Sequence, residues 1–312
     1  MSAAAIDVVT LGESMALFVA GEAGALRDVE HFTRRLAGAE TNVAIGLARL
    51  GLKVAWVSRL GTDSFGDFVL DSVAREGVDC AQVTRDATRP TGFMLKSRAA
   101  AGADPAVEYF RRGSAASALS LRDFDAARFA AARHLHVTGI SPALSGSAAE
   151  LVEHSMRFMR EAGRGISFDP NLRPGLWPGR AAMAGHINRL AALADWVMPG
   201  LAEGRLLTGR DDPADIAAFY LERGAQAVIV KLGADGAYYR TAGEQGTVPG
   251  VPVARIVDTV GAGDGFAAGV LSARLEGLGW PAALARGNWI GARALQSIGD
   301  MDGLPRRSEL PH

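Results

Sequence analysis

The sequence contains one cysteine and lacks any apolar run long enough to cross a bilayer. Cys80 has no partner in the chain for a disulfide or a cysteine-based zinc cluster, and one free thiol is typical of a reducing compartment. Charged residues interrupt the apolar stretches well short of the roughly 18 residues that a membrane helix needs. The first residues have the pattern of a strand and not that of a secretory signal. We therefore expect a cytoplasmic protein that does not bind membranes.

The sequence also lacks an excess of charge of either sign. Its 33 lysines and arginines are matched by 34 aspartates and glutamates, which leaves a net charge of −1. A near-neutral chain has no long-range attraction to nucleic acid, so we expect no such partner. No Gly-Lys-Ser/Thr occurs, and a Gly-x-Gly-x-x-Gly motif fails at Phe266. These absences argue against a P-loop ATPase and an NAD-dependent oxidoreductase.

Glycine, by contrast, is abundant. The 312 residues include 38 glycines, whereas roughly 7% is the usual share in globular proteins. The hydrophobic content of 48% and the charged content of 21% support a sizeable core. A glycine surplus reflects either compositional bias or backbone that approaches a ligand closely, and the positions of the glycines decide between the two.

Short apolar runs of strand length alternate along the chain with stretches of helical period. The strand-like runs are 6–11, 54–60, 134–139, 166–169, 196–198 and 227–232. The helical stretches are 41–50, 65–76, 147–162, 180–194 and 212–223, followed by 262–276 and 281–297. This alternation predicts an α/β fold with a mostly parallel sheet and helices on both faces, formed by residues 1–312 as a single domain.

Two regions, approximately 13–36 and 90–112, interrupt the alternation, because their β-type runs have no helix directly after them. We expect them to form a small antiparallel sheet that serves as a lid. Near the C-terminus, a β-type run at 254–257 precedes the helix that starts at 262, so we expect the sheet to end with a strand-to-helix turn near Asp258.

That turn carries the most informative motif of the chain. Residues 258–264 have the sequence Asp-Thr-Val-Gly-Ala-Gly-Asp and open a helix. Glycines at a helix N-terminus let backbone N–H groups point at an anion, at the positive end of the helix dipole. The short Gly-x-Gly-Asp pattern by itself is equally compatible with an ordinary capping turn.

The longer string resembles the C-terminal signature of the PfkB, or ribokinase-like, carbohydrate kinases. Residues 37–51 resemble the N-terminal signature of the same family, and the resemblance extends over nearly the whole chain. It implies a ribokinase-like fold with a β-sheet lid, and transfer of a phosphoryl group from ATP, with Mg²⁺, to a sugar hydroxyl. It also implies a homodimer formed through the lid, or a higher homo-oligomer, and the edges of a small exposed sheet favour such pairing.

Phosphoryl transfer needs in-line positioning, neutralised charge and an acceptor for the proton of the alcohol. We hypothesise that the backbone N–H groups of Gly261, Ala262 and Gly263 bind the γ-phosphate while Asp264 accepts the hydroxyl proton. Gly38 and Asn42 of the N-terminal signature are expected to contact the sugar. Gly38 would let sugar hydroxyls approach the backbone.

The resemblance also indicates where the nucleotide binds. Residues 228–236 are typical of a buried strand that runs into a glycine-rich turn, and in the family this turn contacts the nucleotide. The candidates are Lys231, Gly233, Gly236, Gly261, Gly263 and Asn288. An ordinary β-turn between residues 232 and 238, and a purely structural asparagine within a helix, are the alternatives.

Family members often carry an Asn-x-x-Glu motif linked to magnesium. Here Gly200 stands in the asparagine position and Glu203 in the glutamate position, so Glu203 is an indirect candidate. Nucleotide phosphates and water would hold most of the ion.

Three strings, at 109–117, 136–140 and 168–174, resemble the 2-keto-3-deoxygluconate kinase branch of the family. That substrate is a sugar acid, and arginine is suited to bind its carboxylate with two parallel hydrogen bonds. The candidates are Arg111 and Arg173, with Tyr109 from the lid. A surface ion pair is the alternative for either arginine. Met94 stands where better-known members have tyrosine.

The sequence therefore predicts an ATP-dependent kinase for 2-keto-3-deoxygluconate or a similar sugar acid. Two alternatives stay open: a kinase for a neutral ketose such as fructose, and a non-catalytic sugar or nucleotide sensor with the same fold.

Overall fold

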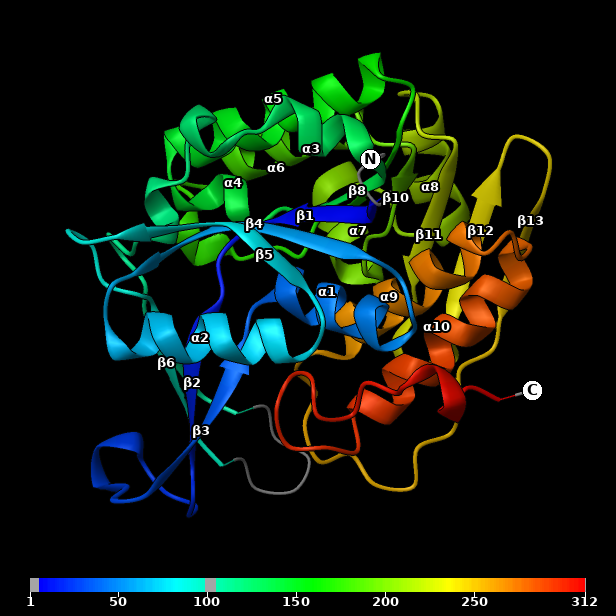
Figure 1. The fold of residues 1–312 in the computed structure, drawn as a ribbon. Coiled ribbons are helices and arrows are strands. Elements are labelled where there is room, and N and C mark those ends of the chain that lie inside the picture. The colour runs from blue at the N-terminus through cyan, green and yellow to red at the C-terminus, as the bar shows by residue number, and fades with distance from the viewer. Residues whose placement is uncertain (1–5, 99–104, 312) are drawn as a thin grey trace.

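The computed structural model describes residues 6–98 and 105–311, which form a nine-stranded sheet between two layers of helices (Figure 1). The strand order is β13-β12-β11-β10-β9-β8-β1-β4-β5. The strands are β1 (Ile6–Leu11), β4 (Val54–Gly61), β5 (Asp79–Asp86), β8 (Ala132–Thr138), β9 (Gly165–Asp169), β10 (Trp196–Val197), β11 (Ala227–Lys231), β12 (Ala237–Thr241) and β13 (Gln245–Val248). Each pairing from β11 to β5 is parallel, and β12 and β13 are antiparallel. The predicted mostly parallel sheet is confirmed.

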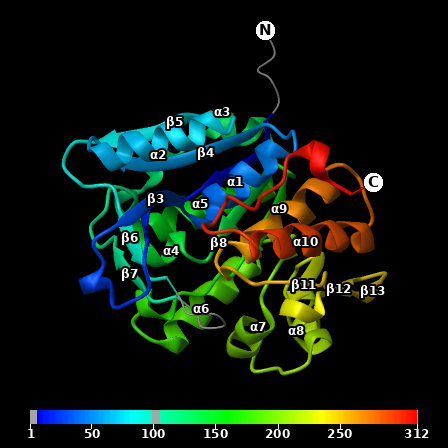
Figure 2. The same ribbon diagram turned by 90° about the horizontal axis from the view of Figure 1, so that it is seen from below.

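Both faces of this sheet are buried, which explains the continuous apolar runs in its central strands. Val8 and Ile229 pack into one hydrophobic cluster, and their chain neighbours Val9 and Val228 pack into the other. One face is covered by α1 (Ala39–Arg49), α2 (Ser64–Arg75), α9 (Ala262–Leu275) and α10 (Trp280–Ala294). The other is covered by α3 (Ala126–Ala131), α4 (Ser141–Leu144), α5 (Gly146–Glu161), α6 (Arg180–Ala191), α7 (Leu201–Thr208) and α8 (Pro213–Leu221). Figure 2 shows the same layers from below.

A second, four-stranded sheet projects from one side of the molecule (Figure 1). Its order is β3 (Phe32–Ala37), β2 (Met15–Ala20), β6 (Phe93–Lys96) and β7 (Val107–Phe110), so it arises from the two regions that interrupt the α/β alternation. The pairs β2–β3 and β6–β7 are antiparallel, as expected. The middle pair, β2–β6, is parallel, because two hairpins from distant parts of the chain lie side by side.

The expectation of a strand at 254–257 is wrong. The chain there is a loop, and the backbone N–H groups of Val257 and Asp258 both donate to the carbonyl of Leu295, after α10. The sheet ends instead with the hairpin β12–β13, which the sequence analysis did not identify, and its other edge is β5, also missed. The apolar run at 254–257 therefore forms an exposed loop that is joined to the end of α10 by backbone hydrogen bonds.

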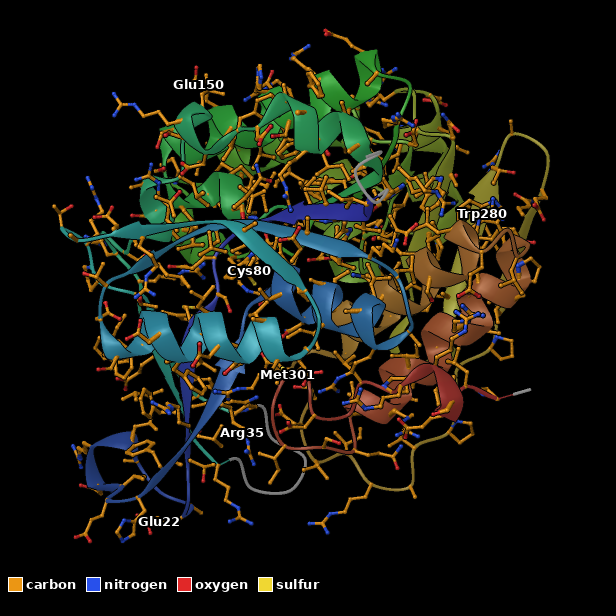
Figure 3. The ribbon with its side chains drawn as sticks, viewed as in Figure 1. Glu22, Arg35, Cys80, Glu150, Trp280 and Met301 are labelled. Carbon is orange, nitrogen blue, oxygen red and sulfur yellow. The ribbon has the colours of Figure 1, made fainter. Side chains whose placement is uncertain are left out.

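The single cysteine, Cys80, lies on β5 and is partly buried, without a disulfide (Figure 3). In the part of the chain that the structure describes, no helix is both long and apolar enough to span a membrane.

Close packing between α9 and α10 sets the position of the motif at 258–264. A β-carbon added to Gly269 of α9 would lie 2.7 Å from the α-carbon of Gly287 in α10. The two helices therefore approach each other at a point where each has no side chain. Because Asp264 lies in the first turn of α9, this contact also helps to place that carboxylate.

Replacement of Gly269 by valine should destabilise the protein by about 1–3 kcal/mol, because the obstructing atoms belong to the backbone and cannot move aside. Chemical denaturation would measure the change in the free energy of unfolding. Gly146→Ala is the control, because a β-carbon there meets nothing within 4 Å. Equal stability of the two variants would contradict the packing argument.

Candidate functional site

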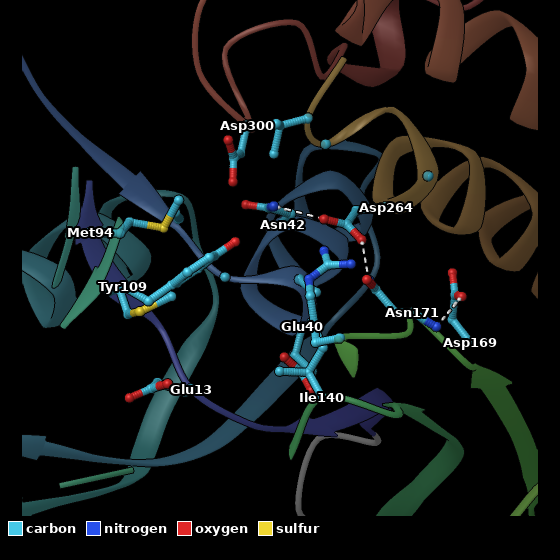
Figure 4. Close-up of a pocket in the computed structure, with 18 of the residues that line it drawn as sticks. Glu13, Glu40, Asn42, Met94, Tyr109, Ile140, Asp169, Asn171, Asp264 and Asp300 are labelled. Atoms are coloured by element: carbon cyan, nitrogen blue, oxygen red, sulfur yellow. Dashed lines mark hydrogen bonds between the residues drawn. The ribbon is translucent and has the colours of Figure 1, made fainter. Parts of the chain in front are cut away.

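A cavity of about 300 Å³ lies at the carboxyl ends of the parallel strands, where the small sheet meets the large one (Figure 4). In open α/β sheets this edge is where ligands bind. Ten residues predicted from the sequence line the cavity: Gly38, Asn42, Tyr109, Arg111, Arg173, Glu203, Lys231, Gly261, Gly263 and Asp264. The fold thus brings together segments from both ends of the chain.

Asp264 is held by two asparagines and is buried. Asn42 Nδ2 donates to Asp264 Oδ2 at 2.8 Å, and Asn171 Nδ2 lies 3.4 Å from the other oxygen. Burial raises the pKa of Asp264 to about 7; the charges of Asp169 and Asp300 add to this, and the Asn42 hydrogen bond opposes it. A carboxylate with a pKa near 7 is suited to accept a proton from a hydroxyl.

The glycines beside Asp264 form the start of a 14-residue helix. Gly261 has φ +84°, and a β-carbon there would lie 2.4 Å from the carbonyl oxygen of Asp300, so only glycine fits. The first N–H groups of a helix have no acceptor within the helix, and they carry the positive end of its dipole. This turn can hold an anion. Ala262 is the first residue of α9 and does not line the cavity.

Lys231 supplies a positive charge next to this helix N-terminus. Its ammonium donates to Asp169 Oδ2 at 2.6 Å, and it would lie 3.7 Å from a β-carbon on Gly263. Burial lowers the pKa of Lys231, but the negative charges of Asp169 and Glu203 outweigh this effect and leave the pKa raised. The positive charge of Lys231 and the positive end of the α9 helix dipole together are suited to bind a polyphosphate.

Glu203 uses both carboxylate oxygens to hold the backbone. Oε1 accepts from the N–H of Leu172 at 2.7 Å, and Oε2 accepts from the N–H of Gly200 at 2.8 Å. Across residues 6–98 and 105–311, no three His, Cys, Asp or Glu side chains are grouped so as to hold a metal ion. Because backbone N–H groups occupy both oxygens of Glu203, the lining fits a magnesium ion held by the nucleotide phosphates and water, and the indirect role of Glu203 stays a prediction.

Gly233, Gly236 and Asn288 do not line the cavity. The two glycines lie in the turn between β11 and β12, where a β-carbon on Gly236 would meet the carbonyl oxygen of Val248. Asn288 Nδ2 donates to the carbonyls of Val248 and Pro249, at 3.1 and 2.9 Å. In this structure Gly236 and Asn288 contact the end of β13 and the loop after it, and nucleotide contact by Gly233, Gly236 and Asn288 stays a prediction.

The two candidate arginines differ in how they are engaged. Nε and Nη2 of the buried Arg111 both contact Glu13 Oε2, at 2.6 and 2.5 Å, so one edge of its guanidinium is occupied. Arg173 is partly buried and donates from Nη1 to the carbonyl of Leu172. Arg173 therefore keeps more donors for a ligand than Arg111 does.

The sequence analysis missed four buried acids in the cavity: Glu13 and Asp169, which pair with Arg111 and Lys231, and Glu40 and Asp300. Glu40 accepts from the hydroxyls of Thr138 and Ser141 at 2.8 and 2.7 Å, and burial raises its pKa. Burial also raises the pKa of Asp300 to about 6. Glu40 could have been found from its place in the N-terminal signature. Asp300 follows the last helix with no local pattern that marks it.

Asp264 and Asp300 should each contribute a fall in the stability of the ligand-free protein as the pH rises from about 4 to 7. The buried His134 and His136, whose pKa values burial lowers to about 3, instead contribute a rise in stability. Asp264 and Asp300 have pKa values above their usual 3.8, so between about pH 4 and 7 the folded state binds protons that the unfolded state has released. Asp264→Asn should remove part of this fall in denaturant unfolding experiments. Asp211→Asn, at a carboxylate that is 96% exposed, should leave it unchanged. A slope in Asp264→Asn equal to that of the wild type would contradict the raised pKa.

Comparisons with known proteins agree with the geometry. The family described as pfkB family carbohydrate kinase matches residues 5–307. The chain is 53% identical over 306 residues to a 2-dehydro-3-deoxygluconokinase of Bacillus subtilis (strain 168), covering 98% of this chain and 94% of that protein. A solved PfkB protein from Polaromonas sp. JS666 superimposes with a TM-score of 0.91 at 53% identity, covering 98% of this chain and 99% of that one. An E. coli protein described as a ribokinase II, solved with ATP and Mg²⁺, superimposes with a TM-score of 0.90 at 29% identity over 97% of both chains. The resemblance seen in the sequence is confirmed, and the chain belongs to the pfkB family of carbohydrate kinases.

Proposed function

We propose that this chain transfers the γ-phosphoryl group of ATP, in the presence of Mg²⁺, to a hydroxyl of 2-dehydro-3-deoxygluconate (2-keto-3-deoxygluconate) or a closely similar sugar acid. The observation that carries the proposal is Asp264, a buried carboxylate with a pKa of about 7 next to a helix N-terminus that can bind an anion. The similarity to the B. subtilis 2-dehydro-3-deoxygluconokinase supports the choice of substrate.

In this proposal Asp264 acts as the general base. Asn42 orients it through the hydrogen bond to Oδ2, which leaves Oδ1, only distantly approached by Asn171, to meet the sugar hydroxyl. The N–H groups of Gly261, Ala262 and Gly263 and the ammonium of Lys231 stabilise the negative charge on the moving phosphoryl group. Magnesium supplies further neutralisation of the phosphates when it is bound.

The carboxylate of the sugar acid is assigned to Arg173, with Tyr109 beside it. Arg173 lies after β9 and has free donors, whereas Arg111 already faces Glu13. Arg111 also lies 5.7 Å from the ring centre of Tyr109. We assign Arg111 to the support of that ring and of the cavity wall.

A kinase for a neutral ketose is the second candidate. It is favoured by the occupied edge of the Arg111 guanidinium and by Met94, a buried side chain that brings no hydroxyl to the cavity. A non-catalytic sensor is disfavoured, because the proton acceptor and the anion-binding turn are both in place.

We also assign the small sheet as a lid and as the surface through which two copies pair. Tyr109 and Phe110, at the end of β7, are 47% and 46% exposed, and Phe110 stacks on Phe93 at 4.6 Å. β7 is one of the two edge strands of the small sheet, and an edge strand with large exposed aromatic side chains favours pairing with a second copy. A cytoplasmic location goes with this proposal, because the reaction consumes ATP.

A coupled assay of ADP release over a panel of sugars and sugar acids tests the activity. We expect turnover with 2-dehydro-3-deoxygluconate in excess of that with neutral ketoses. Asp264→Asn should lower kcat by about 10²- to 10⁴-fold, because it removes the proton acceptor. Fructose as the preferred substrate would favour the second candidate, and no ADP release with any compound would favour the sensor.

Arg173→Met should raise KM for the sugar acid at least about tenfold, since a charge-assisted hydrogen bond is lost, and should leave KM for a neutral sugar within about twofold. Steady-state kinetics on both kinds of substrate would measure this. Arg112→Met is the control, because Arg112 neighbours Arg111 and is exposed outside the cavity. Equal effects of Arg173→Met on both substrates would contradict carboxylate recognition.

Sedimentation at micromolar concentration should detect a homodimer, and the double substitution of Tyr109 and Phe110 by serine should shift it toward monomer. The exposed rings supply apolar area that a paired copy would bury. Ile256→Ser, at an apolar side chain that is 59% exposed far along the chain, should leave the dimer unchanged. A dimer that persists in the double variant would contradict pairing through the lid.

A further inference from the structure

Lys96 is a buried lysine that the proposed mechanism does not use. It is the last residue of β6, its side chain is 2% exposed, and it does not line the cavity. Its ammonium lies 2.5 Å from Asp258 Oδ2 and 3.9 Å from Asp300 Oδ1, and both carboxylates are buried as well. Lysine is almost never buried to this degree unless it is paired, so these contacts account for its position.

Asp258, the partner of Lys96, holds two loops together. It is the first residue of the turn at 258–264, and its Oδ1 accepts from the N–H of Val260 at 3.1 Å. Its Oδ2 lies 3.4 Å from the N–H of Gly299, in the loop that carries Asp300. The carbonyl of Asp300 in turn packs against Gly261. The Lys96–Asp258 pair therefore connects the small sheet to the backbone that would bind phosphate.

The charges around Lys96 make its ammonium necessary at this place. Two buried carboxylates, Asp258 and Asp300, face it, and the charge of Asp300 also acts on Asp264. Burial raises the pKa of Asp300, and the charge of Arg173 lowers that pKa by less. Without the ammonium, Asp258 would remain as a buried, uncompensated negative charge beside an anion-binding turn, and it would repel a terminal phosphate.

We infer that Lys96 is a positioning residue that ties strand β6 of the small sheet to the phosphate-binding turn through Asp258, so that this sheet and the turn take up their working arrangement together. This inference rests on the proposed function as an ATP-dependent kinase. Lys96 acts through Asp258 and the turn, so loss of Lys96 should weaken the binding of the terminal phosphate of ATP.

Two substitutions and two measurements test the inference. Lys96→Gln keeps a hydrogen-bond donor and removes the charge, and Lys96→Ala leaves space where the ammonium was. Calorimetric titration with the magnesium complexes should show affinity for ATP lowered at least tenfold and affinity for ADP within twofold of the wild type. Steady-state kinetics should show kcat lowered at least tenfold, with KM for the sugar within threefold.

Methylammonium has the head group of lysine and should restore kcat of Lys96→Ala at least fivefold, whereas tetramethylammonium, which is too large, should not. Arg35→Met is the matched control. Arg35 lies on β3 of the same small sheet, and its Nε is 3.4 Å from Asp302 of the same C-terminal loop, but both side chains are about two-fifths exposed (Figure 3). This variant should keep wild-type values of kcat and of both affinities.

A folded Lys96→Gln protein with wild-type kcat and a wild-type ratio of ATP to ADP affinity would overturn the inference. Equal loss of ATP and ADP binding, or no response of a folded Lys96→Ala to methylammonium, would overturn it as well, because a merely structural role would then suffice. If Lys96→Ala does not fold, the ratio of ATP affinity to ADP affinity of Lys96→Gln is the deciding measurement. A wild-type protein that phosphorylates no compound of the panel would instead overturn the proposed function. In that case the ratio of ATP affinity to ADP affinity, compared between Lys96→Gln and the wild type, still tests Lys96.

Discussion

The hydrogen bond between Asn42 and Asp264 joins residues 222 positions apart, and the arrangement of the site depends on it. Asn42 belongs to the first turns of α1 and Asp264 to the first turn of α9, and these two helices pack against each other on one face of the sheet. The pairing places two helix N-termini at one edge of the sheet. The hydrogen bond also fixes the orientation of the Asp264 carboxylate. Burial favours the protonated form of this group, and the hydrogen bond from Asn42 opposes that effect.

Acidic side chains are concentrated at this edge, and most of them are stabilised by an ion pair or by hydrogen bonds from hydroxyls. Glu13 is paired with Arg111, Asp169 with Lys231, and Asp258 with Lys96. Glu40 is held by two hydroxyls. Asp264 and Asp300 have no direct cation at hydrogen-bond distance, and burial raises the pKa of each, to about 7 and about 6. The cations placed among these acids explain how a chain of net charge −1 can form a local site for a polyanion.

Most strands and helices of the α/β layers could be predicted from the sequence, because a strand buried on both faces is a continuous apolar run and a surface helix has its own period. The prediction was wrong at 254–257, where an apolar run lies in an exposed loop, and it missed β12, whose half-buried pattern lacks a continuous run. The glycines fall into two groups, one at the cavity and one at close packing contacts. Gly38, Gly261 and Gly263 lie at the cavity, whereas Gly236 and Gly269 serve close packing.

The sequence by itself determined the fold class, the two signature segments and the residue that we propose as proton acceptor, because these depend on residue types at short spacing. Only the tertiary structure decided which arginine keeps more donors for a ligand, that Asn288 supports a loop, and that Lys96 and Asp300 lie against the turn at 258–264. Each of these facts depends on contacts between residues far apart in the chain. Neither composition nor local periodicity contains information on which distant side chains share a buried space.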